Sequence, residues 1–344
     1  MKDDSMKDDL LKDDLMKDDL MKDDLLTRLA PLTSRINEMM ELTLKADGDF
    51  FGEMGIYNFQ AGGKRLRPII FCLSYQAVGG ELDEDCIKVA TAFEYLHMAT
   101  LMHDDIIDLA DTRRNQPASH HIFGIPETVL AGDYFLAKAA LMCVSKKNMD
   151  AAIVLVEVIR DLTLGELNEL KAKNNVDLSK QEYMRIIFQK TAALMQGASK
   201  VAAILVEGDE KLQQALGMYG QCMGLAFQIM DDILDYTAQK KRLGKPVMQD
   251  LAEGRITLPF IMARESLAAS DAERLRELGK KFDLTDQERL EANFLVKQAG
   301  GIELSLKEAE LLAQQAIDAL TALPDTLHRR LLGSIAAYTV TRDY

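Results

Sequence analysis

The sequence predicts an all-helical protein. Its 344 residues include 18 methionines, only 7 prolines and no tryptophan, and leucine and alanine are abundant. Leucine, alanine and methionine favour helices, and few runs alternate β-branched with polar residues as a strand would. A chain of this length can bury a sizeable core, as one large domain or two. No run approaches the roughly 18 apolar residues of a membrane-spanning helix, so we expect a soluble protein.

Charge and cysteine content narrow the possible functions. The formal net charge is -14, which argues against binding nucleic acid through its phosphates, because that requires a basic surface. The cysteines, at positions 72, 86, 143 and 222, have no CxxC spacing, so neither a disulfide framework nor a zinc site is indicated. The N-terminus lacks the basic-then-apolar order of a signal peptide. We therefore expect a cytoplasmic protein.

The first 25 residues form a repeat of their own, the pentads MKDDS, MKDDL, LKDDL, MKDDL and MKDDL. On an α-helix a five-residue repeat advances by about 140°, so its apolar residues build no single buried face. Its Asp pairs lack a folded scaffold that would fix the geometry of a metal site. We interpret residues 1–25 as a low-complexity tail, either disordered or an irregular helix, and residues 26–344 as one helical domain.

The first segment that suggests a binding site is basic and has the sequence QAGGKRLRP, at residues 60–68. Pro68 suits the first turn of a helix and Gly79 suits its end. This register puts Lys64, Arg65 and Arg67 at a helix N-terminus, where free N–H groups and the helix dipole favour an anion. In an otherwise acidic chain the pattern favours a phosphate site over a surface basic cluster.

A long helix is expected over residues 85–110, leading into the first acidic motif, LMHDDIIDLADTRR. Asp104 and Asp108 are four residues apart and project from one helix face, with Asp105 beside them. Three carboxylates at this range repel one another and need a counter-charge. Mg²⁺ is the natural candidate, because it prefers oxygen ligands and bridges carboxylates to substrate phosphates. The alternative is a solvated acidic helix face.

A second acidic motif favours the metal. Asp231, Asp232 and Asp235 repeat the spacing of the first motif within an apolar helical segment, GLAFQIMDDILDY. Gln228 lies on the same face, so an amide sits beside the carboxylates. The polar loop that follows could close over a metal-bound diphosphate and exclude water. The cations of that loop are Lys240, Lys241, Arg242, Lys245 and Arg255.

Other side chains near these motifs could bind phosphate. Arg113 and Arg114 directly follow the first acidic motif and could grip the same phosphates. His97 lies two turns before Asp104 on the same stripe, so its imidazole could donate to a phosphate near the metals; a purely structural histidine is the alternative.

A cation and a hydroxyl stand side by side further along the chain. Ser179 and Glu182 form a capping box that opens the helix carrying Lys190 and Thr191. This pair could also serve a phosphate. The tandem His120–His121 has no partner ligands in sequence, and we predict that it lies in a loop.

Two acidic faces, separate basic clusters and an apolar interior together indicate a substrate with a diphosphate head and an apolar tail. Metal ions would neutralise the diphosphate and make it a better leaving group. Its departure leaves a carbocation, which needs a dry, apolar cavity more than a protein nucleophile. No Ser-His-Asp or Cys-His set is evident in the chain, which agrees with this chemistry.

The combination of motifs resembles the polyprenyl synthetase family of trans-isoprenyl diphosphate synthases, most closely its long-chain, octaprenyl-type members. The resemblance covers residues 26–344 and rests on GGKRLRP, DDIIDLADTRR, the Lys190-Thr191 pair, FQIMDDILD and GKPVMQDLAEGR. It implies a bundle of ten or more helices around a deep central cavity, usually in a homodimer. It also implies head-to-tail (1′-4) condensation of isopentenyl diphosphate onto an allylic diphosphate.

The resemblance also implies roles for individual residues, with two or three Mg²⁺ ions as cofactor. Isopentenyl diphosphate would be bound by Lys64, Arg67, His97 and Arg114. Magnesium would be held by Asp104, Asp108, Asp231 and Asp235, with Asp105 and Asp232 in support. The allylic diphosphate would be held by Arg113, Lys190, Thr191, Gln228, Lys245 and Arg255.

The chain departs from the family pattern at three positions. Asn115 stands where a glycine usually follows the arginine pair, and Met248 replaces the glycine of the GKPxGxD pattern. Arg255 stands where lysine is usual, which keeps the charge but changes the hydrogen-bond geometry. These departures bear on loop closure and rate rather than on the reaction.

Product length can be argued from helix geometry. Thr100 lies one turn and Leu96 two turns below Asp104, with Ala99 alongside, and each turn spans about 5.4 Å, similar to an isoprene unit. In the family, bulky aromatics one turn before the acids form a floor for short products. Because residues 99 and 100 are small here, we expect a product of roughly six to ten isoprene units, of the kind used for quinone side chains. Phe93 and Tyr95 are the nearest aromatics that could instead limit it.

Three alternatives remain at this stage. A short-chain farnesyl or geranylgeranyl diphosphate synthase would share all the chemistry. A terpene cyclase would share the metal site but has no use for a second diphosphate site. A non-catalytic partner subunit typically loses one acidic motif, and both are intact here. Release of a long apolar product would bring the enzyme into transient contact with a membrane. The sequence contains no basic amphipathic helix that would indicate such contact.

Overall fold

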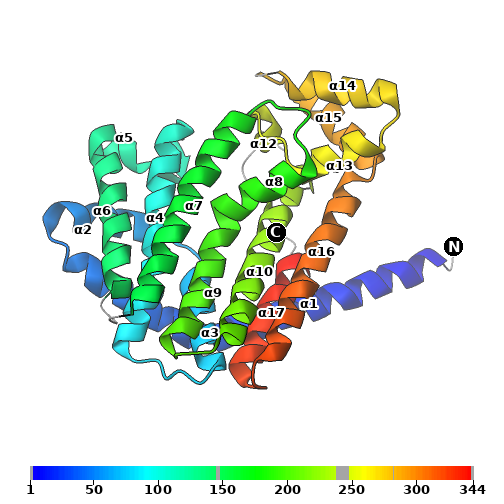
Figure 1. Cartoon of the computed structure of the whole chain (residues 1–344). Coiled ribbons are helices and arrows are strands. Elements are labelled where there is room, and N and C mark those ends of the chain that lie inside the picture. The colour runs from blue at the N-terminus through cyan, green and yellow to red at the C-terminus, as the bar shows by residue number, and fades with distance from the viewer. Residues whose placement is uncertain (1–2, 145–147, 238–247, 282, 342–344) are drawn as a thin grey trace.

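The computed structural model describes residues 3–144, 148–237, 248–281 and 283–341 and is built almost entirely of helices (Figure 1). The prediction of an all-α bundle with ten or more helices is confirmed. The strands described are the two-residue β1 (Thr112–Arg113) and β2 (Gln116–Pro117), which pair antiparallel just after the first acidic motif.

The helices follow one another with short connections. Their bounds are α1 Asp3–Lys45, α2 Asp49–Gln60, α3 Leu66–Ala77, α4 Glu84–Ile107, α5 Ser119–Phe123, α6 Ile125–Val144, α7 Met149–Ala172, α8 Lys180–Ile187, η1 Phe188–Ala192, α9 Ala193–Leu205, α10 Glu210–Thr237, α12 Gln249–Ala252, α13 Leu258–Ser266, α14 Ala269–Gly279, α15 Asp286–Gln298, α16 Gly301–Ala319, η2 Leu320–Ala322 and α17 Leu327–Thr341.

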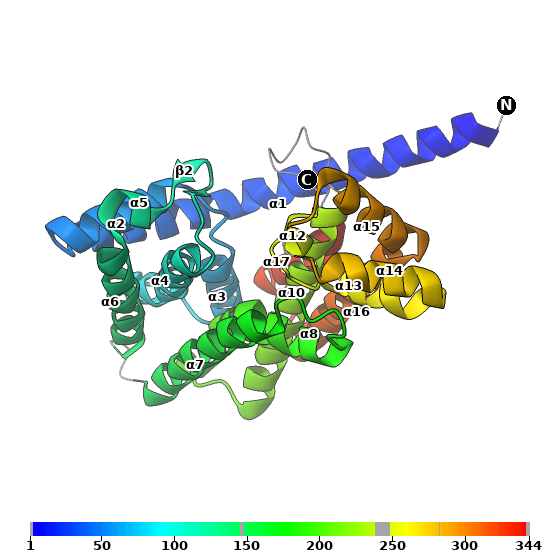
Figure 2. The same ribbon diagram turned by 90° about the horizontal axis from the view of Figure 1, so that it is seen from above.

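Helix α1 runs along one side of the bundle, and its N-terminal part extends past the other helices (Figures 1 and 2). It continues without interruption from Asp3 through Pro31 to Lys45, so no helix end marks the boundary at residue 25. Leu25 and Leu29 are buried, and with them α1 joins the hydrophobic core.

Helix α10 lies at the centre of the bundle, packed against α9 and α16, and α4 packs against α6 and α3. Figure 2 shows the bundle from above. Two glycines let α10 approach α9 closely. A Cβ at Gly220 would lie 2.4 Å from the carbonyl oxygen of Met195, and one at Gly224 would lie 2.6 Å from Cα of Ala192. The carboxylates further along α10 are therefore placed by a close helix-to-helix contact.

Several local predictions are confirmed. Pro68 lies in the first turn of α3, and Gly79 follows its end with φ of 95°, a conformation that favours glycine. The side chain of Ser179 accepts from the backbone N–H of Glu182, and Glu182 in turn accepts from Ser179, so the predicted capping box opens α8.

Three local predictions need correction. Helix α4 ends at Ile107 rather than 110, so Asp108 caps its C-terminus, although the Asp108 backbone still donates to the Asp104 carbonyl at 2.8 Å. His120 and His121 lie in the short helix α5, not in a loop. Lys190 and Thr191 belong to the π-helical turn η1, not to regular α-helix. Such turns insert an extra residue and are frequent at functional sites.

Within the described residues, no helix combines the length and apolar character that crossing a membrane requires.

The Gly220 contact generates a stability prediction. Gly220→Ala should lower the free energy of unfolding by about 1–3 kcal/mol, because the new methyl group meets backbone rather than a side chain that could move away. Gly217→Ala is the matched control on the same helix, since nothing lies within 4 Å of its Cβ position. It should be neutral or stabilising by about 0.5–1 kcal/mol. Urea unfolding measures both, and equal effects of the two variants would contradict the packing argument.

Candidate active site

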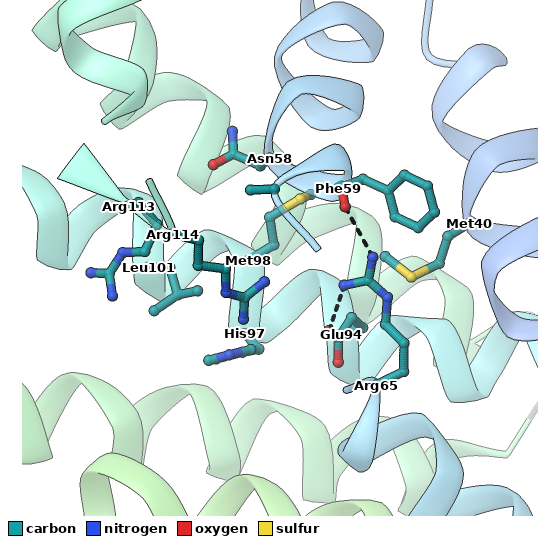
Figure 3. Close-up of a pocket in the computed structure, with 11 residues that line it drawn as sticks. Met40, Asn58, Phe59, Arg65, Glu94, His97, Met98, Leu101, Arg113 and Arg114 are labelled. Atoms are coloured by element: carbon teal, nitrogen blue, oxygen red, sulfur yellow. Dashed lines mark hydrogen bonds and ion pairs between the residues drawn. The ribbon is translucent and has the colours of Figure 1, made fainter. Parts of the chain in front are cut away.

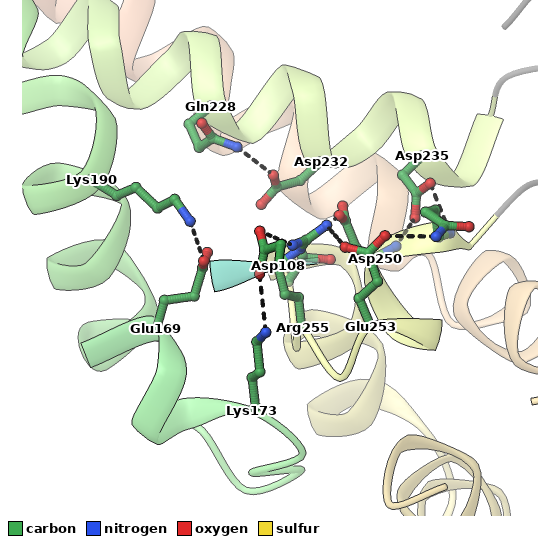
Figure 4. A network of polar contacts seen from close by, with 12 residues as sticks. Asp108, Glu169, Lys173, Lys190, Gln228, Asp232, Asp235, Asp250, Glu253 and Arg255 are labelled. Carbon is green, nitrogen blue, oxygen red and sulfur yellow. Dashed lines mark hydrogen bonds and ion pairs between the residues drawn. The ribbon is translucent and has the colours of Figure 1, made fainter. Parts of the chain in front are cut away.

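The two acidic motifs come together with a third acidic segment on α7. Glu169 approaches the Lys190 ammonium, and the Glu166 Oε2 lies 2.9 Å from the same nitrogen. Asp108, which caps the C-terminus of α4, accepts from Lys173, which caps the C-terminus of α7, with Nζ 3.2 Å from Oδ1. Figure 4 shows α7, the end of α4 and the segment with Asp250, Glu253 and Arg255 converging on this network.

The contribution of α7 was missed by sequence reasoning. A usable signal exists, because positions 166 and 169 are three residues apart and share one face of α7. Gly165 explains the close approach: a Cβ there would lie 2.5 Å from the Lys190 backbone nitrogen. The π-turn therefore rests directly on α7, which brings Lys190 to the two glutamates.

The carboxylates that support the two motifs are turned inward. Asp105, 2% exposed, accepts from the Arg113 Nε at 2.9 Å. Asp232, 5% exposed, accepts from the Tyr183 hydroxyl at 2.6 Å and from the Gln228 amide at 2.9 Å. Gln228 in turn accepts from the Thr191 hydroxyl at 2.8 Å. The Thr191 and Gln228 side chains are thus joined to the second motif in one chain of hydrogen bonds.

Asp235 is tied to the segment that follows its own helix. Its carboxylate accepts from the backbone N–H groups of Gln249 and Asp250, both at 3.0 Å. Arg255 donates through Nε to the Asp250 Oδ1 at 3.0 Å, and its Nη1 lies 3.7 Å from the Asp108 Oδ2. Arg255 therefore links the first motif to the neighbourhood of the second. Asp250 is a further acidic member of the site that sequence reasoning did not assign.

Burial and crowding shift the titration of these acids. Burial raises the pKa of Asp104 to about 7; Lys190 opposes the shift, and Glu166 and Glu169 add to it. Burial and the adjacent Asp250 raise the pKa of Asp235 to about 6, against the two backbone N–H groups. Negative charge is therefore in excess over the cations that the chain itself supplies.

A basic cluster adjoins the first acidic motif, because Arg113, which pairs with Asp105, also lines the cavity of this cluster. Arg114, His97 and Arg113 line a small cavity of about 30 Å³ together with Arg65 and Glu94 (Figure 3). Burial, followed by the charges of Arg67 and Arg114, holds the pKa of His97 well below its usual value, so its imidazole is neutral at pH 7. Burial also lowers the pKa of Arg67.

Arg65 does not belong to this cluster as a phosphate ligand. Its guanidinium pairs with Glu94, with Nη1 3.1 Å from Oε1. The sequence places Arg65 at the same helix N-terminus as Lys64 and Arg67 but gives it no substrate-binding role, and this ion pair shows what the side chain does instead. Lys245, with the neighbouring Lys240, Lys241 and Arg242, lies outside the described residues.

Comparison with known proteins agrees with this geometry. Residues 49–294 match the Polyprenyl synthetase family. The chain is 34% identical over 317 residues to the octaprenyl diphosphate synthase of Haemophilus influenzae, covering 91% of this chain and 95% of the relative.

This chain belongs to the polyprenyl synthetase family. It is therefore an enzyme that transfers prenyl groups.

Solved structures of other members share the fold of this polyprenyl synthetase. A polyprenyl synthase from Caulobacter crescentus CB15, complexed with calcium and isoprenyl diphosphate, superimposes with a TM-score of 0.85 at 31% identity, covering 93% of this chain and 97% of the other. A geranylgeranyl pyrophosphate synthetase from Pyrococcus horikoshii Ot3 gives 0.85 at 32% identity, with coverages of 94% and 99%.

The acidic side chains of this polyprenyl synthetase fit a divalent metal ion by chemistry. Asp104, Asp108, Asp231 and Asp235 offer only oxygen donors, the type that Mg²⁺ prefers. The raised pKa values of Asp104 and Asp235 mark negative charge that a cation would neutralise. Among the described residues, however, no three His, Cys, Asp or Glu side chains already converge on one metal position, since Lys173 and Arg255 draw Asp108 aside.

Two departures from the family pattern have a common physical basis. Asn115 and Met248, which stand where the family usually has glycine, both have φ of 64°. Glycine adopts this left-handed conformation without cost, asparagine tolerates it, and methionine is strained there. The Met248 side chain is fully buried, and its backbone donates to the Asp235 carbonyl at 3.0 Å, so contacts beside the second motif hold the strained residue in place.

The raised pKa of Asp104 predicts a pH-dependent stability. Without divalent cations, Asp104→Asn should stabilise the fold at pH 8 by on the order of 1–3 kcal/mol. The reason is that it removes a carboxylate whose ionised form is destabilised in the folded protein. In the folded protein Asp104 takes up a proton below about pH 7, whereas in the unfolded chain it stays ionised down to about pH 4. The wild type therefore gains stability as pH falls through this window, and the advantage of the variant disappears.

Urea unfolding at pH 8 and pH 5 measures this difference. The matched control is Asp111→Asn, which removes a carboxylate that is 94% exposed and lies close in sequence. An advantage of Asp104→Asn that is equal at both pH values would contradict the assignment.

Proposed function

We propose that this polyprenyl synthetase condenses isopentenyl diphosphate head to tail (1′-4) onto an allylic diphosphate and produces a long, all-trans polyprenyl diphosphate. The observation that carries the proposal is the presence of two separate anion-binding regions. The acidic site with Lys190 and the basic cluster of Arg67, His97 and Arg114 are distinct but adjacent, because Arg113 lines the cavity of the basic cluster and also pairs with Asp105 of the first acidic motif. A terpene cyclase, which handles one diphosphate, has no use for the second region.

The basic cluster is proposed to hold isopentenyl diphosphate, with Lys64, Arg67, His97 and Arg114 as its ligands. Neutral His97 donates a hydrogen bond without adding charge. The partly buried Arg67 supplies a cation whose Nε has no hydrogen-bond partner within the described residues, and guanidinium groups bind phosphate through paired N–H groups.

The acidic site is proposed to hold the allylic diphosphate together with two or three Mg²⁺ ions. Asp104, Asp108, Asp231 and Asp235 would hold the metal, which when bound neutralises the diphosphate and makes it a better leaving group. The inward-facing Asp105 and Asp232 act through Arg113 and Gln228 rather than on the metal. The direct diphosphate ligands would be Arg113, Lys190, Thr191, Gln228, Lys245 and Arg255.

The reaction itself needs few protein groups. The bond between C1 and oxygen of the allylic diphosphate breaks, C1 joins C4 of isopentenyl diphosphate, and a proton leaves C2 to restore a double bond. Lys190 and Arg255 oppose the charge that develops on the departing diphosphate, since both are cationic and point into the acidic site. The aliphatic and aromatic side chains of α4 below Asp104 keep water from the cation.

The length of the product is proposed to depend on α4. Thr100 keeps part of its surface accessible and donates to the His97 carbonyl at 2.9 Å, whereas Leu96 and Ala99 are completely buried. Phe93 is also buried and stacks on Phe71 with centroids 5.8 Å apart, so it is engaged in the core. Of the three chain-length candidates, Thr100 is therefore the one placed to meet the growing chain.

The proposed activity is tested by incubating the protein with Mg²⁺, farnesyl diphosphate and labelled isopentenyl diphosphate and sizing the dephosphorylated products. We expect products of roughly thirty to fifty carbons, from six to ten isoprene units. A product that stops at fifteen or twenty carbons would support the short-chain alternative. No incorporation with any primer would favour the partner-subunit alternative.

The same assay tests the role of Thr100. Thr100→Phe should shorten the product, because a ring one turn below Asp104 closes the path within about 5.4 Å. Thr100→Ser keeps the hydroxyl and the small volume and should leave the product length unchanged. Full-length product from Thr100→Phe, with normal turnover, would exclude Thr100 as a limit.

A homodimer is proposed from an apolar surface on two consecutive helices. Soluble proteins rarely leave contiguous apolar patches of more than a few hundred Å² uncovered. A second copy of the chain can cover such a surface by a two-fold contact, the commonest form of association. The exposed large apolar side chains on the described parts of α6 and α7 are Ile125, Val129, Leu130, Leu141, Val144, Met149, Ile153, Val156, Leu164, Leu167 and Leu170.

Substitution within this surface should break the dimer. Leu141 is 70% exposed, and Leu141→Asp would place a charge in the contact at little cost to the isolated chain. The matched control is Leu290→Asp, on α15, where the leucine is 66% exposed but lies outside the surface. Analytical ultracentrifugation should find monomers only for Leu141→Asp. A monomeric wild type, or dimers of both variants, would argue against this contact.

We further propose that the enzyme works in the cytoplasm and touches a membrane only transiently, when it releases its product. The support is chemical: a polyprenyl chain of this length is apolar along its whole tail and partitions into a bilayer.

A further inference from the structure

Arg65 is the cation of the GGKRLRP segment that the proposed chemistry does not use. It is 6% exposed, and its backbone has φ of 50° and ψ of 34°, the left-handed conformation that non-glycine residues rarely adopt. A charged side chain in such a backbone position is kept only where its surroundings hold it. The contacts of its guanidinium show what those surroundings are.

All three guanidinium nitrogens are occupied within the protein. Nε donates to the Asn37 Oδ1 on α1 at 3.0 Å, and Nη2 donates to the Phe59 carbonyl in the last turn of α2 at 3.0 Å. Nη1 donates to the Glu94 Oε1 on α4 at 3.1 Å and lies 3.4 Å from the Gly62 carbonyl. The guanidinium also lies over the Phe59 ring, 4.6 Å from its centroid. Three helices and one loop therefore meet on a single side chain.

The loop held in this way is the one that presents the basic residues. Gly63, with φ of 152°, passes between two guanidiniums: its Cβ position would lie 2.8 Å from the Arg65 Nη1 and 2.9 Å from the Arg114 Nη1. Lys64 and Arg67 follow immediately. A displacement of Arg65 would therefore move the backbone that carries both proposed ligands.

Glu94 is the carboxylate that fixes Arg65. It is 5% exposed and pairs through Oε1 with the Arg65 guanidinium, while its second oxygen, Oε2, makes no hydrogen bond within the described residues (Figure 3). Burial lowers the pKa of both Arg67 and Arg114, and Glu94 opposes that shift. The negative charge of Glu94 therefore balances the positive charges of the basic cluster. Its ion pair with Arg65 also holds the loop 62–64 in place.

Resting on the proposed function, we propose that Arg65 is a positioning residue for the isopentenyl diphosphate site. Its guanidinium, fixed by Glu94, holds the loop 62–64 so that Lys64 and Arg67 face the diphosphate. It does not touch the substrate itself. Four of its five N–H groups are directed at protein oxygens, those of Asn37, Gly62, Glu94 and Phe59, and the side chain is 6% exposed, so the guanidinium is engaged within the protein rather than turned toward a ligand.

Direct binding tests the proposal without turnover. Isothermal titration calorimetry with isopentenyl diphosphate alone measures the basic site, and farnesyl diphosphate with Mg²⁺ measures the acidic site. Arg65→Gln should weaken isopentenyl diphosphate binding by about tenfold, the effect of losing about one well-placed polar interaction. Farnesyl diphosphate binding should change by less than about twofold, which also shows that the variant is folded.

Glu94→Gln separates positioning from simple charge balance. If Glu94 acts by holding Arg65, its loss should weaken isopentenyl diphosphate binding, and Arg65→Gln in the same chain should add little, since the two residues form one unit. If Glu94 acted only as a negative charge near the site, its removal would tighten binding of the anion. Arg65→Lys should weaken isopentenyl diphosphate binding by an intermediate amount, because lysine keeps the positive charge but lacks the planar guanidinium that reaches several acceptors at once.

The matched control is Arg274→Gln, which removes a guanidinium paired with Glu291 and Glu277 on α15 and α14, away from both sites. It should leave both affinities unchanged. Unchanged isopentenyl diphosphate binding by Arg65→Gln, tighter binding by Glu94→Gln, or equal loss for both ligands would each overturn the positioning role. A wild type that fails to bind isopentenyl diphosphate would instead overturn the proposed function.

Discussion

Crowding of carboxylates between α4, α7 and α10 is the constraint on which the site depends. Like charges at this range are tolerated in a folded chain only when cations or hydrogen-bond donors balance them. The chain supplies some of that balance itself, through Lys190 against the glutamates of α7 and through Arg255 beside Asp250. The remaining excess appears as raised pKa values of Asp104 and Asp235. The same excess that costs stability makes the region suited to divalent cations and diphosphate.

Close helix packing makes this crowding possible. Gly165 admits the backbone of the π-turn to α7, and Gly220 and Gly224 bring α10 onto α9. Side chains at these positions would separate the helices and draw Lys190 away from its glutamates. The charged groups are therefore held by backbone contacts, which are stiffer than contacts between flexible side chains. A site that must orient a substrate gains from that stiffness.

Strained backbone gathers around both anion-binding regions. Arg65 and Arg114 border the basic cluster, and Met248 follows the second acidic motif, all with φ between 50° and 64°. At two of these positions a neighbouring contact maintains the conformation: the ion pair with Glu94 for Arg65, and the hydrogen bond to the Asp235 carbonyl for Met248. In both regions, charged side chains lie next to helix ends, on backbone that neighbouring contacts hold in place.

The sequence by itself determined whatever depends on spacing along one element. It predicted the all-helical fold, the capping box at Ser179 and the ends of α3, because helix periodicity and end residues are local. It also predicted the two acidic motifs as sites, since i and i+4 positions share a helix face whatever the tertiary structure. The family resemblance, carried by those motifs, is confirmed.

Only the tertiary structure decided which groups meet across elements. Glu166 and Glu169 reach Lys190 because α7 packs on η1, and Asp250 reaches Asp235 because the chain turns back after α10. Arg65 looked like its neighbours in sequence, yet Glu94, 29 positions away, decides its role. The physical reason is that helix periodicity fixes the direction of a side chain relative to its own axis. The packing of separate helices fixes what lies in that direction.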